Sequence, residues 1–297
     1  MSNQSIHPSA VIHPSAKVGN NVSIGAYSVI GPDVIIGDGT KLDSHVVIES
    51  NTTLGKDCSI SSMAVLGGTP QDNSFKNETT RVIIGDRVRL REFVTVQRAT
   101  GEGNNTIIGD DCFLMAYCHV AHNCKLGKGV TMANNAQLAG HIELGDFVVL
   151  GGFAGLHQNI RVGRMAMIGA VSGSRYDVPP FALVDGARPT LIRGLNKVAL
   201  KRQGVSLDDR LALKRAFQKL FFSELNVTQA IEYIKENQAQ NPYVDELLEF
   251  MQTSRRHVLT TTIRKLNSNG RMEMEDSERD MLEDDTNETE QTPSLVG

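Results

Sequence analysis

The segment IHPSAVIHPSAKVGNNVSIGAYSVIGPDVIIGDGTKL, residues 6–42, has an aliphatic residue at every sixth position. The same phase continues to Leu66, returns at Ile84, Leu90 and Val96, and then runs from Ile108 to Ile168. A period of six fits neither an α-helix nor an isolated alternating strand, but it is typical of parallel β-helices, whose short strands meet at repeated corners. Three hexads make one triangular coil of about 18 residues. The sequence therefore predicts a mainly β fold, a parallel β-helix with its aliphatic residues stacked inside.

Glycine often directly follows the aliphatic residue, as at Gly19, Gly25 and Gly127. We expect glycine there because a residue without Cβ turns the chain at little cost. Small residues tend to lie four positions after the aliphatic residue, and the four cysteines occupy such places. These cysteines are interpreted as core fillers in a reducing compartment, without disulfides.

Two polar segments interrupt the repeat, GGTPQDNSFKNETTR at 67–81 and QRATGEGNNT at 97–106. We expect both to be loop excursions, which can carry binding residues or be tolerated insertions. The six-residue rhythm stops after DVPPFALVDG, and Ser206 and Asp209 then have the spacing of a helix start. Three helical segments follow, RLALKRAFQKLFF, TQAIEYIKE and NPYVDELLEFMQ.

The sequence thus predicts three parts. Residues 1–190 form the β-helix domain, residues 191–266 form a small α-helical C-terminal domain, and residues 267–297 form an acidic, disordered tail.

The composition restricts the class of partner. The net charge is -4, with 30 Lys and Arg against 34 Asp and Glu, so no basic excess attracts nucleic acid or a membrane surface. The N-terminus lacks the features of a signal peptide, and no apolar run of about 18 residues is present. We expect a cytoplasmic protein with no stable membrane insertion, whose anionic ligands are held by local basic clusters.

Four histidines cluster in CHVAHNC, LAGHIEL and GLHQNI. With about 18 residues per coil, His122, Gly140 and Gln158 should stack in consecutive coils, with His119, His141 and His157 beside them. A neutral imidazole can remove a proton from a hydroxyl, and the Gly140 N–H, with no side chain in the way, can stabilise an oxyanion. The cluster therefore favours a base at His122 over histidines that serve only the surface.

A metal site is the competing interpretation of MAYCHVAHNC, residues 115–124. Cys118 and Cys124 are hexad mates and lie on adjacent faces of a coil, so one ion could not easily gather both cysteines with His119 and His122. We therefore predict no metal.

Further motifs carry a resemblance to a known family. PQDNSF, AHNC, NNAQLAGHIELGDF, GGFAGLHQ, DVPPF and GLNKVALKRQG, in this order over residues 6–257, closely resemble those of bacterial UDP-N-acetylglucosamine O-acyltransferases, which act first in lipid A synthesis. The resemblance implies a left-handed parallel β-helix and a homotrimer with active sites between neighbouring subunits. It implies transfer of an (R)-3-hydroxyacyl group from acyl carrier protein to the 3-OH of UDP-N-acetylglucosamine, without any cofactor beyond the carrier's phosphopantetheine thioester.

The resemblance also assigns residues. It makes His122 the general base, with Asn123 beside it, and gives Gly140 the oxyanion N–H. It places the substrate contacts at Gln71, Asp72, His119, His141, His157, Gln158, Asn196 and Arg202, and puts the position that measures acyl length at Ala170.

The chain departs from the family pattern at four positions. Asn123 stands where some members have Asp, and it can orient the imidazole but not neutralise its charge. Ser74, Gln97 and Val198 replace a Lys, a His and a Glu expected at substrate contacts. These changes concern the sugar contacts and affinity more than the reaction.

Three alternatives remain at this stage. An N-acyltransferase acting on a 3-amino UDP-sugar needs the same base and oxyanion donor. A γ-class carbonic anhydrase needs two histidines five apart, whereas His119 and His122 are three apart. A non-catalytic trimeric scaffold explains the hexads but not the histidines beside Gly140.

Overall fold

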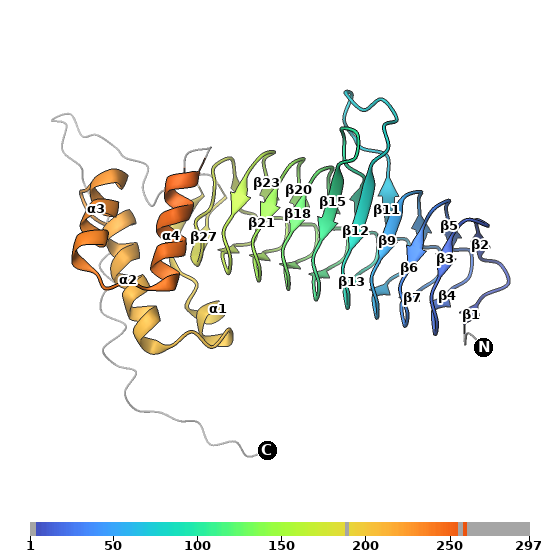
Figure 1. Cartoon of the computed structure of the whole chain (residues 1–297), viewed down its shortest axis with the longest axis horizontal. Helices are drawn as coiled ribbons and strands as arrows, with labels where there is room; N and C mark the ends of the chain where they lie inside the picture. The colour runs from blue at the N-terminus through green and yellow to red at the C-terminus, as the bar shows by residue number, and fades with distance from the viewer. Residues whose placement is uncertain (1–3, 188–189, 255–257, 260–297) are drawn as a thin grey trace, which may run out of the picture. The chain divides into compact units, whose positions relative to one another are not determined.

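A computed structural model describes residues 4–187, 190–254 and 258–259 of the chain. The strands in these residues stack into three sheets, which form the three sides of a left-handed parallel β-helix (Figure 1). The predicted fold class is confirmed, including the small helical part that follows the β-helix.

Each sheet takes one strand from every coil. Sheet A contains β1 (Ser5–Ile6), β4 (Ser23–Ile24), β7 (Lys41–Leu42), β10 (Ser59–Ile60), β13 (Arg89–Leu90), β16 (Phe113–Leu114), β19 (Thr131–Met132), β22 (Val149–Leu150), β25 (Met167–Ile168), β27 (Ala182–Asp185) and β28 (Leu191–Leu195). Sheet B contains β2 (Val11–Ile12), β5 (Val29–Ile30), β8 (Val47–Ile48), β11 (Val65–Gly68), β14 (Thr95–Gln97), β17 (His119–Val120), β20 (Gln137–Leu138), β23 (Gly155–Leu156) and β26 (Gly173–Ser174). Sheet C contains β3 (Lys17–Val18), β6 (Ile35–Ile36), β9 (Thr52–Leu54), β12 (Arg81–Ile84), β15 (Asn105–Ile108), β18 (Lys125–Leu126), β21 (Glu143–Leu144) and β24 (Arg161–Val162).

The hexad aliphatic residues point into the β-helix. Ile48, Leu66 and Leu114 have no exposed surface. The small residues four positions later also face inward, and Cys58, Cys112, Cys118 and Cys124 are buried free thiols, as predicted. The core therefore consists of columns of inward-facing side chains that stack from one coil to the next.

The predicted reason for the glycines is wrong. Gly19, Gly25 and Gly127 do not adopt a positive φ. A Cβ on Gly25 would instead lie 2.6 Å from the backbone of Asp43 in the next coil. Glycine is needed at these positions because adjacent coils approach each other closely, not because the chain turns there.

The turning residue lies three positions after the hexad aliphatic residue. It adopts a left-handed conformation, with φ 55° at Asn21 and 57° at Asp33. Asn and Asp tolerate this region, but bulky side chains rarely adopt it. At the corner between sheets A and B the position is nonetheless mostly aromatic or apolar. Asn135 occupies this position between Tyr117 and Phe153. We call the other members of the column the corner ridge: Tyr27, His45, Met63, Phe93, Tyr117, Phe153 and Val171.

The corner between sheets B and C carries both excursions. The first, residues 69–80, joins β11 to β12, and the second, residues 98–104, joins β14 to β15. The strands on either side keep their register, with Arg81 paired to Asn105. Figure 1 shows the excursions projecting from the β-helix near β11, β12 and β15. Since β17 belongs to the next coil, the excursions also contact the segment that follows β17, where the Thr100 N–H donates to the Asn123 Oδ1.

Four helices follow the β-helix: α1 (Lys197–Arg202), α2 (Leu207–Phe221), α3 (Val227–Asn237) and α4 (Pro242–Thr253). The last three match the predicted helical segments, and Ser206 caps α2 by accepting a hydrogen bond from the Asp209 N–H. The short α1 was not predicted. The predicted boundary at residue 191 falls between β27 and β28, which pair antiparallel, so the sheet continues past it. Residues 1–261 form one compact unit, and the predicted tail, residues 267–297, lies outside the described residues.

The helices contact the end of the β-helix through an ion pair and an aromatic contact. Arg164 pairs with Glu246 of α4 at 2.6 Å, and the Phe181 and Tyr243 rings meet edge to face. None of the helices within the described ranges combines the length and the apolar character needed to cross a membrane.

Candidate active site

His122, Gly140 and Gln158 stack at the corner between sheets B and C, as the spacing predicts. The His141 N–H donates to the His122 carbonyl at 3.0 Å, and the Asn159 N–H donates to the Gly140 carbonyl at 3.0 Å. Each residue of the column thus lies one coil above the previous one. The hexad repeat fixes this arrangement because strands β17, β20 and β23 pair in register.

Gly140 leaves the space that the His122 imidazole occupies. A Cβ on Gly140 would lie 2.5 Å from both Cε1 and Nε2 of that ring, closer than real Cβ contacts allow. Among the described residues, the Gly140 N–H has no hydrogen-bond partner. An unpaired backbone donor therefore lies beside a histidine nitrogen, which is the arrangement that acyl transfer requires.

The His122 ring has partners on both nitrogens. Its Nδ1 is 2.9 Å from the Asn123 Oδ1, and its Nε2 is 3.8 Å from the Asp72 Oδ2. The His141 ring meets it edge to face at 5.1 Å. Asp72 comes from the first excursion, so the site combines a coil corner with a loop.

The Asp72 carboxylate is stabilised as an anion. Its Oδ1 accepts a hydrogen bond from the Ser74 N–H at 2.8 Å. Hydrogen bonds from Ser74 lower the pKa of Asp72 below its usual value, and the nearby His122 lowers it further. A carboxylate therefore faces the Nε2 side of His122 at neutral pH.

The two excursions are bonded to each other. The Gly101 N–H donates to the Glu78 carboxylate at 2.8 Å, and the Thr79 N–H donates to that of Glu102 at 2.9 Å. The Gly101 N–H is also the main reason why the pKa of Glu78 is lowered. Residues 69–80 and 98–104 consequently form one unit beside His122.

The neighbouring histidines are held in the neutral form. Burial lowers the pKa of His119, and the nearby His122 adds to this effect. Burial and His122 also lower the pKa of His141, against the opposing influence of Asp72. His119 Nδ1 is further fixed by Thr95 Oγ1 at 2.7 Å. Neutral imidazoles can donate and accept hydrogen bonds, as a sugar ligand requires.

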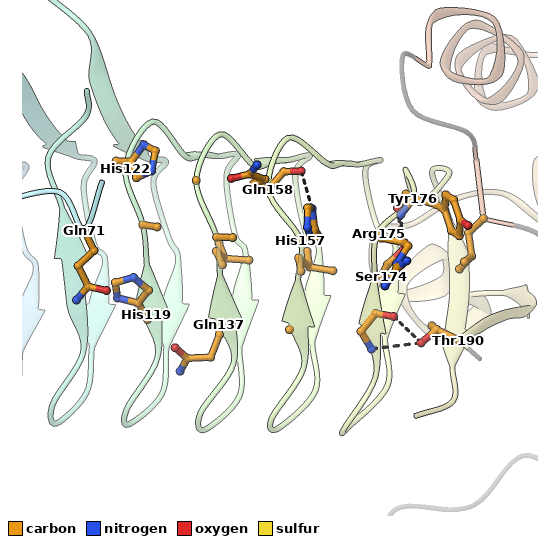
Figure 2. A pocket seen from close by; sticks show the side chains of 18 of the residues that line it. Gln71, His119, His122, Gln137, His157, Gln158, Ser174, Arg175, Tyr176 and Thr190 are labelled. Atoms are coloured by element: carbon orange, nitrogen blue, oxygen red, sulfur yellow. Dashed lines mark hydrogen bonds between the residues drawn. The ribbon is translucent and has the colours of Figure 1, made fainter. Parts of the chain in front are cut away.

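A groove of about 860 Å³ runs along the outer face of sheet B from this corner. Figure 2 shows Gln71, His119 and His122 at one end and Arg175, Tyr176 and Thr190 at the other. The lining residues that were predicted as site residues are Gln71, His119, His122, Gly140, His157 and Gln158.

The shape of the groove follows from one column of outward-facing residues. His119 pairs with Gln137, which pairs with Gly155, which pairs with Gly173. The side chains become smaller along this column, from His119 to Gln137 and then to two glycines. A Cβ on Gly155 would meet nothing within 4 Å. The floor therefore opens toward the C-terminal end.

The sequence analysis named Gln97 as a departure from the family pattern, and it lines the groove, where it accepts a hydrogen bond from the Gln71 N–H at 3.3 Å. Other lining residues were missed by the sequence reasoning, among them Gln137, which extends from β20. Ser174, Arg175, Tyr176 and Thr190 close the far end. Gln137 could have been predicted from the sequence, because it lies 18 residues after His119 and therefore pairs with it in the next coil.

Five predicted substrate contacts do not line the groove: Asp72, His141, Ala170, Asn196 and Arg202. Asp72 and His141 lie against the His122 ring, whereas the other three lie elsewhere. Ala170 is exposed at the corner between sheets A and B, next to Val171 of the corner ridge. Arg202 is exposed at the end of α1. Asn196 is buried and caps α1, with its amide oxygen accepting from the Ala199 N–H and its amide nitrogen donating to the Met165 carbonyl. The structure thus gives Asn196 a capping role that the sequence reasoning missed.

The cysteines of MAYCHVAHNC point away from the histidines. The thiols of Cys118 and Cys124 donate to the carbonyls of Ala133 and Ala139, each at 3.1 Å. Burial raises the pKa of Cys118 to about 11 and that of Cys124 to about 12. They are not available as ligands, and in the described part of the chain no cluster of three or more His, Cys, Asp or Glu residues could hold a metal ion.

Comparison with family models finds three matches. Residues 177–259 match the model described as domain 2 of UDP N-acetylglucosamine O-acyltransferase, and residues 105–140 match that of the bacterial transferase hexapeptide. Residues 1–100 match the model described as the GMPPB C-terminal domain.

Similar whole proteins share one name, acyl-[acyl-carrier-protein]--UDP-N-acetylglucosamine O-acyltransferase. The relative from Thermodesulfovibrio yellowstonii is 44% identical over 254 residues, which cover 85% of this chain and 98% of the relative. The relative from Xylella fastidiosa is 42% identical over 255 residues, covering 86% and 97%.

Solved structures agree. The UDP-N-acetylglucosamine acyltransferase of Francisella novicida superposes with a TM-score of 0.84 at 34% identity, covering 87% of this chain and 95% of that chain. The enzyme of the same name from Campylobacter jejuni gives 0.81 at 39% identity, covering 87% and 100%.

Proposed function

The chain belongs to the family of acyl-[acyl-carrier-protein]--UDP-N-acetylglucosamine O-acyltransferases, and we propose that His122 is the general base of its reaction. It is an enzyme that transfers an acyl group from acyl carrier protein to UDP-N-acetylglucosamine, in lipid A synthesis. The group transferred is an (R)-3-hydroxyacyl chain, and the acceptor is the sugar 3-hydroxyl. The packing of the His122 ring against Gly140 is the observation that carries this proposal.

The reaction proceeds as a proton transfer coupled to acyl transfer. The sugar hydroxyl lies against the Nε2 of His122, which removes its proton as the oxygen attacks the thioester carbonyl. The negative charge that develops on the carbonyl oxygen is stabilised by the Gly140 N–H. The carbon–sulfur bond then breaks, and the proton held by His122 passes to the departing phosphopantetheine thiolate. No cofactor beyond that thioester is required, and no metal takes part.

Substrate contacts follow from the groove. Asp72 and His141 lie against the His122 ring, and Gln71 and His119 line the adjoining end of the groove. These four side chains form hydrogen bonds with the sugar. Asp72 also stabilises the charged imidazole, a role that the neutral Asn123 cannot fill. His157 and Gln158 lie two coils further along and contact the rest of the substrate.

The active protein is a homotrimer. Tyr117, Phe153 and Val171 of the corner ridge are more than half exposed although they hold a costly left-handed conformation. The exposure of these apolar side chains is explained if the ridge packs against another copy of the chain. If the ridge of one subunit covers sheet B of the next, Ala170 reaches the neighbour's groove, where it limits acyl length. Arg202 then contacts the nucleotide across the same interface.

The O-acyltransferase activity is favoured over the N-acyltransferase alternative, because the relatives reported above are named for O-acylation. We propose that the protein acts in the cytoplasm, because the cysteines of the described β-helix are free thiols, as is usual in a reducing compartment.

A product mass spectrum tests this function. Wild-type protein is incubated with UDP-N-acetylglucosamine and a panel of hydroxyacyl carrier proteins, beside His122→Ala and the control His13→Ala, whose imidazole bonds Ser15 in the first coil. We expect ester product from wild type and the control, and at least about a hundredfold less from His122→Ala. Full activity of His122→Ala would refute the base, and activity only on the 3-amino analogue would support the alternative.

A further inference from the structure

The side chain of Asn123 is held at both ends by one residue of the second excursion. Its Oδ1 accepts hydrogen bonds from the N–H of Thr100 at 2.9 Å and from the Thr100 hydroxyl at 3.0 Å. Its Nδ2 donates to the Thr100 carbonyl at 3.0 Å. The same Oδ1 is 2.9 Å from the Nδ1 of His122.

This pattern fixes which way the amide points. If Asn123 were turned over, its NH₂ group would face the Thr100 N–H, and its oxygen would face the Thr100 carbonyl. Both contacts would be repulsive. The oxygen therefore faces His122, and an amide oxygen only accepts.

The direction of the amide sets the tautomer of the base. Because Asn123 Oδ1 is an acceptor, the Nδ1 of His122 carries the proton. The Nε2, which faces Asp72 and Gly140, is left with its lone pair free. Only this tautomer can remove a proton from a hydroxyl at the Nε2 side.

We propose that Thr100 is a positioning residue for His122, acting through the amide of Asn123. This inference rests on the proposed role of His122 as the base. The Thr100 hydroxyl and N–H hold the amide, and the amide holds the imidazole in its reactive tautomer and orientation. Thr100 is not among the residues that line the groove.

The surrounding structure holds this relay in place. Asn123 has φ 61°, and its N–H donates to the Thr106 hydroxyl at 2.9 Å. The Thr100 carbonyl also accepts from the Asn104 side chain at 2.9 Å. The backbone on both sides is thus fixed, so the position of the imidazole follows that of the second excursion.

The relay also gives a reason for the neutral Asn123. A carboxylate would hold the imidazole through its charge. An amide holds it only when its oxygen faces the imidazole, and three hydrogen bonds with Thr100 fix the amide in that orientation. The charged and titratable groups that face His122 from the other elements are Asp72, His119 and His141.

Kinetics of Thr100 variants test the proposal. Thr100→Val removes the hydroxyl but keeps the N–H, and we expect kcat to fall about tenfold, with the KM for UDP-N-acetylglucosamine within about twofold of wild type. Thr100→Ser restores the hydroxyl and should restore kcat to within about twofold. The matched control Thr53→Val, on the outer face of sheet C, should leave kcat unchanged. An unchanged kcat in Thr100→Val, or no recovery in Thr100→Ser, would overturn the proposal.

A second measurement does not depend on activity. Nitrogen-15 NMR of histidine-labelled protein distinguishes the two imidazole tautomers, and the His122 signal is assigned by its loss in His122→Ala. We expect wild type to show His122 protonated at Nδ1, and Asn123→Ala, which removes the acceptor, to show a mixture of tautomers. Thr100→Val keeps the backbone N–H and carbonyl that set the direction of the amide, so it should keep the wild-type tautomer. Protonation of His122 at Nε2 in wild type, or an unchanged tautomer in Asn123→Ala, would overturn the relay. If wild type lacks acyltransferase activity, the proposed function fails, whereas the tautomer result still decides the relay.

Discussion

Gly140 matters at the scale of single residues because of the atom it lacks. The space of its missing Cβ is filled by the His122 ring, and its φ is not in the left-handed region. Steric fit, not backbone freedom, therefore requires glycine here. The same residue supplies the N–H that we assign to the oxyanion.

Replacing Gly140 by alanine should displace the base while leaving the fold intact. The new Cβ would lie 2.5 Å from the imidazole, so the ring must move away from its reactive position. We expect kcat to fall at least about a hundredfold, with little change in Tm, measured by enzyme assay and thermal unfolding. The control is Gly152→Ala at the corresponding position of another corner, where the Cβ has 3.4 Å of room. Near-normal turnover in Gly140→Ala would contradict the assigned packing.

The histidines beside the base should make stability depend on pH. Burial lowers the folded-state pKa of His119 from the ordinary 6.5, so below about pH 6.5 the unfolded chain binds a proton that the folded chain does not. The free energy of unfolding should therefore be greatest above that pH and fall as the pH drops toward the folded value. His119→Gln should flatten this fall, as followed by urea unfolding at several pH values. An identical slope in the variant would show that His119 is not responsible.

Much of the site could be predicted from sequence, because the hexad phase fixes which residues stack. His122, Gly140 and Gln158 were found in this way. Thr100 was missed, since the excursions follow no repeat and their contacts depend on loop geometry. The role of the repeated glycines was also misread, because contact between coils does not appear in the sequence of one coil.

At the scale of elements, the two excursions act as one. They leave the same corner in consecutive coils and are joined by the Glu78–Gly101 and Thr79–Glu102 hydrogen bonds. The first excursion supplies Asp72 and the second supplies Thr100, so both sides of His122 depend on this junction. The helices, in contrast, were predicted well because capping residues such as Ser206 mark their starts.

Removing Glu78 should loosen the junction. Its carboxylate accepts from the Gly101 and Lys76 N–H groups, and Glu78→Ala leaves both without a partner. We expect kcat to fall about threefold to tenfold and the Gly101 amide to exchange faster with solvent, measured by hydrogen exchange. Glu236→Ala, at an exposed position on α3, is the control. Unchanged exchange at Gly101 would show that the excursions are held in another way.

At the scale of the whole molecule, the corner ridge is an energetically unfavourable feature of an isolated subunit. Aromatic and branched side chains occupy strained positions and are left in solvent, with Phe153 66% exposed and Val171 61% exposed. The Phe93 and Tyr117 rings stack at 4.7 Å, so these two members of the ridge pack on each other across neighbouring coils. The proposed trimer would account for the free-energy cost of the ridge, because another subunit would cover these side chains.

Phe153→Asp should separate assembly from folding. Aspartate tolerates the left-handed conformation at φ 58°, so the β-helix should remain stable, while a charge at the ridge should disrupt the trimer. We expect light scattering to show a monomer and the assay to show loss of activity. Leu207→Glu, which changes an equally exposed apolar residue at the start of α2, should remain trimeric. A trimeric, active Phe153→Asp would exclude the ridge as the interface.

The stacking of coils also limits how this protein can change in evolution. A deletion of six residues between His122 and Gly140 would move every later residue onto another side of the coil, and so would separate these two residues. A deletion of a whole coil would preserve the sides and shorten the groove by one strand spacing, roughly 4.8 Å. Insertions of any length are compatible with the coil phase only at the two excursions. Among related proteins, the length of the groove is therefore expected to differ by whole coils, whereas the length of the excursions can differ by any number of residues.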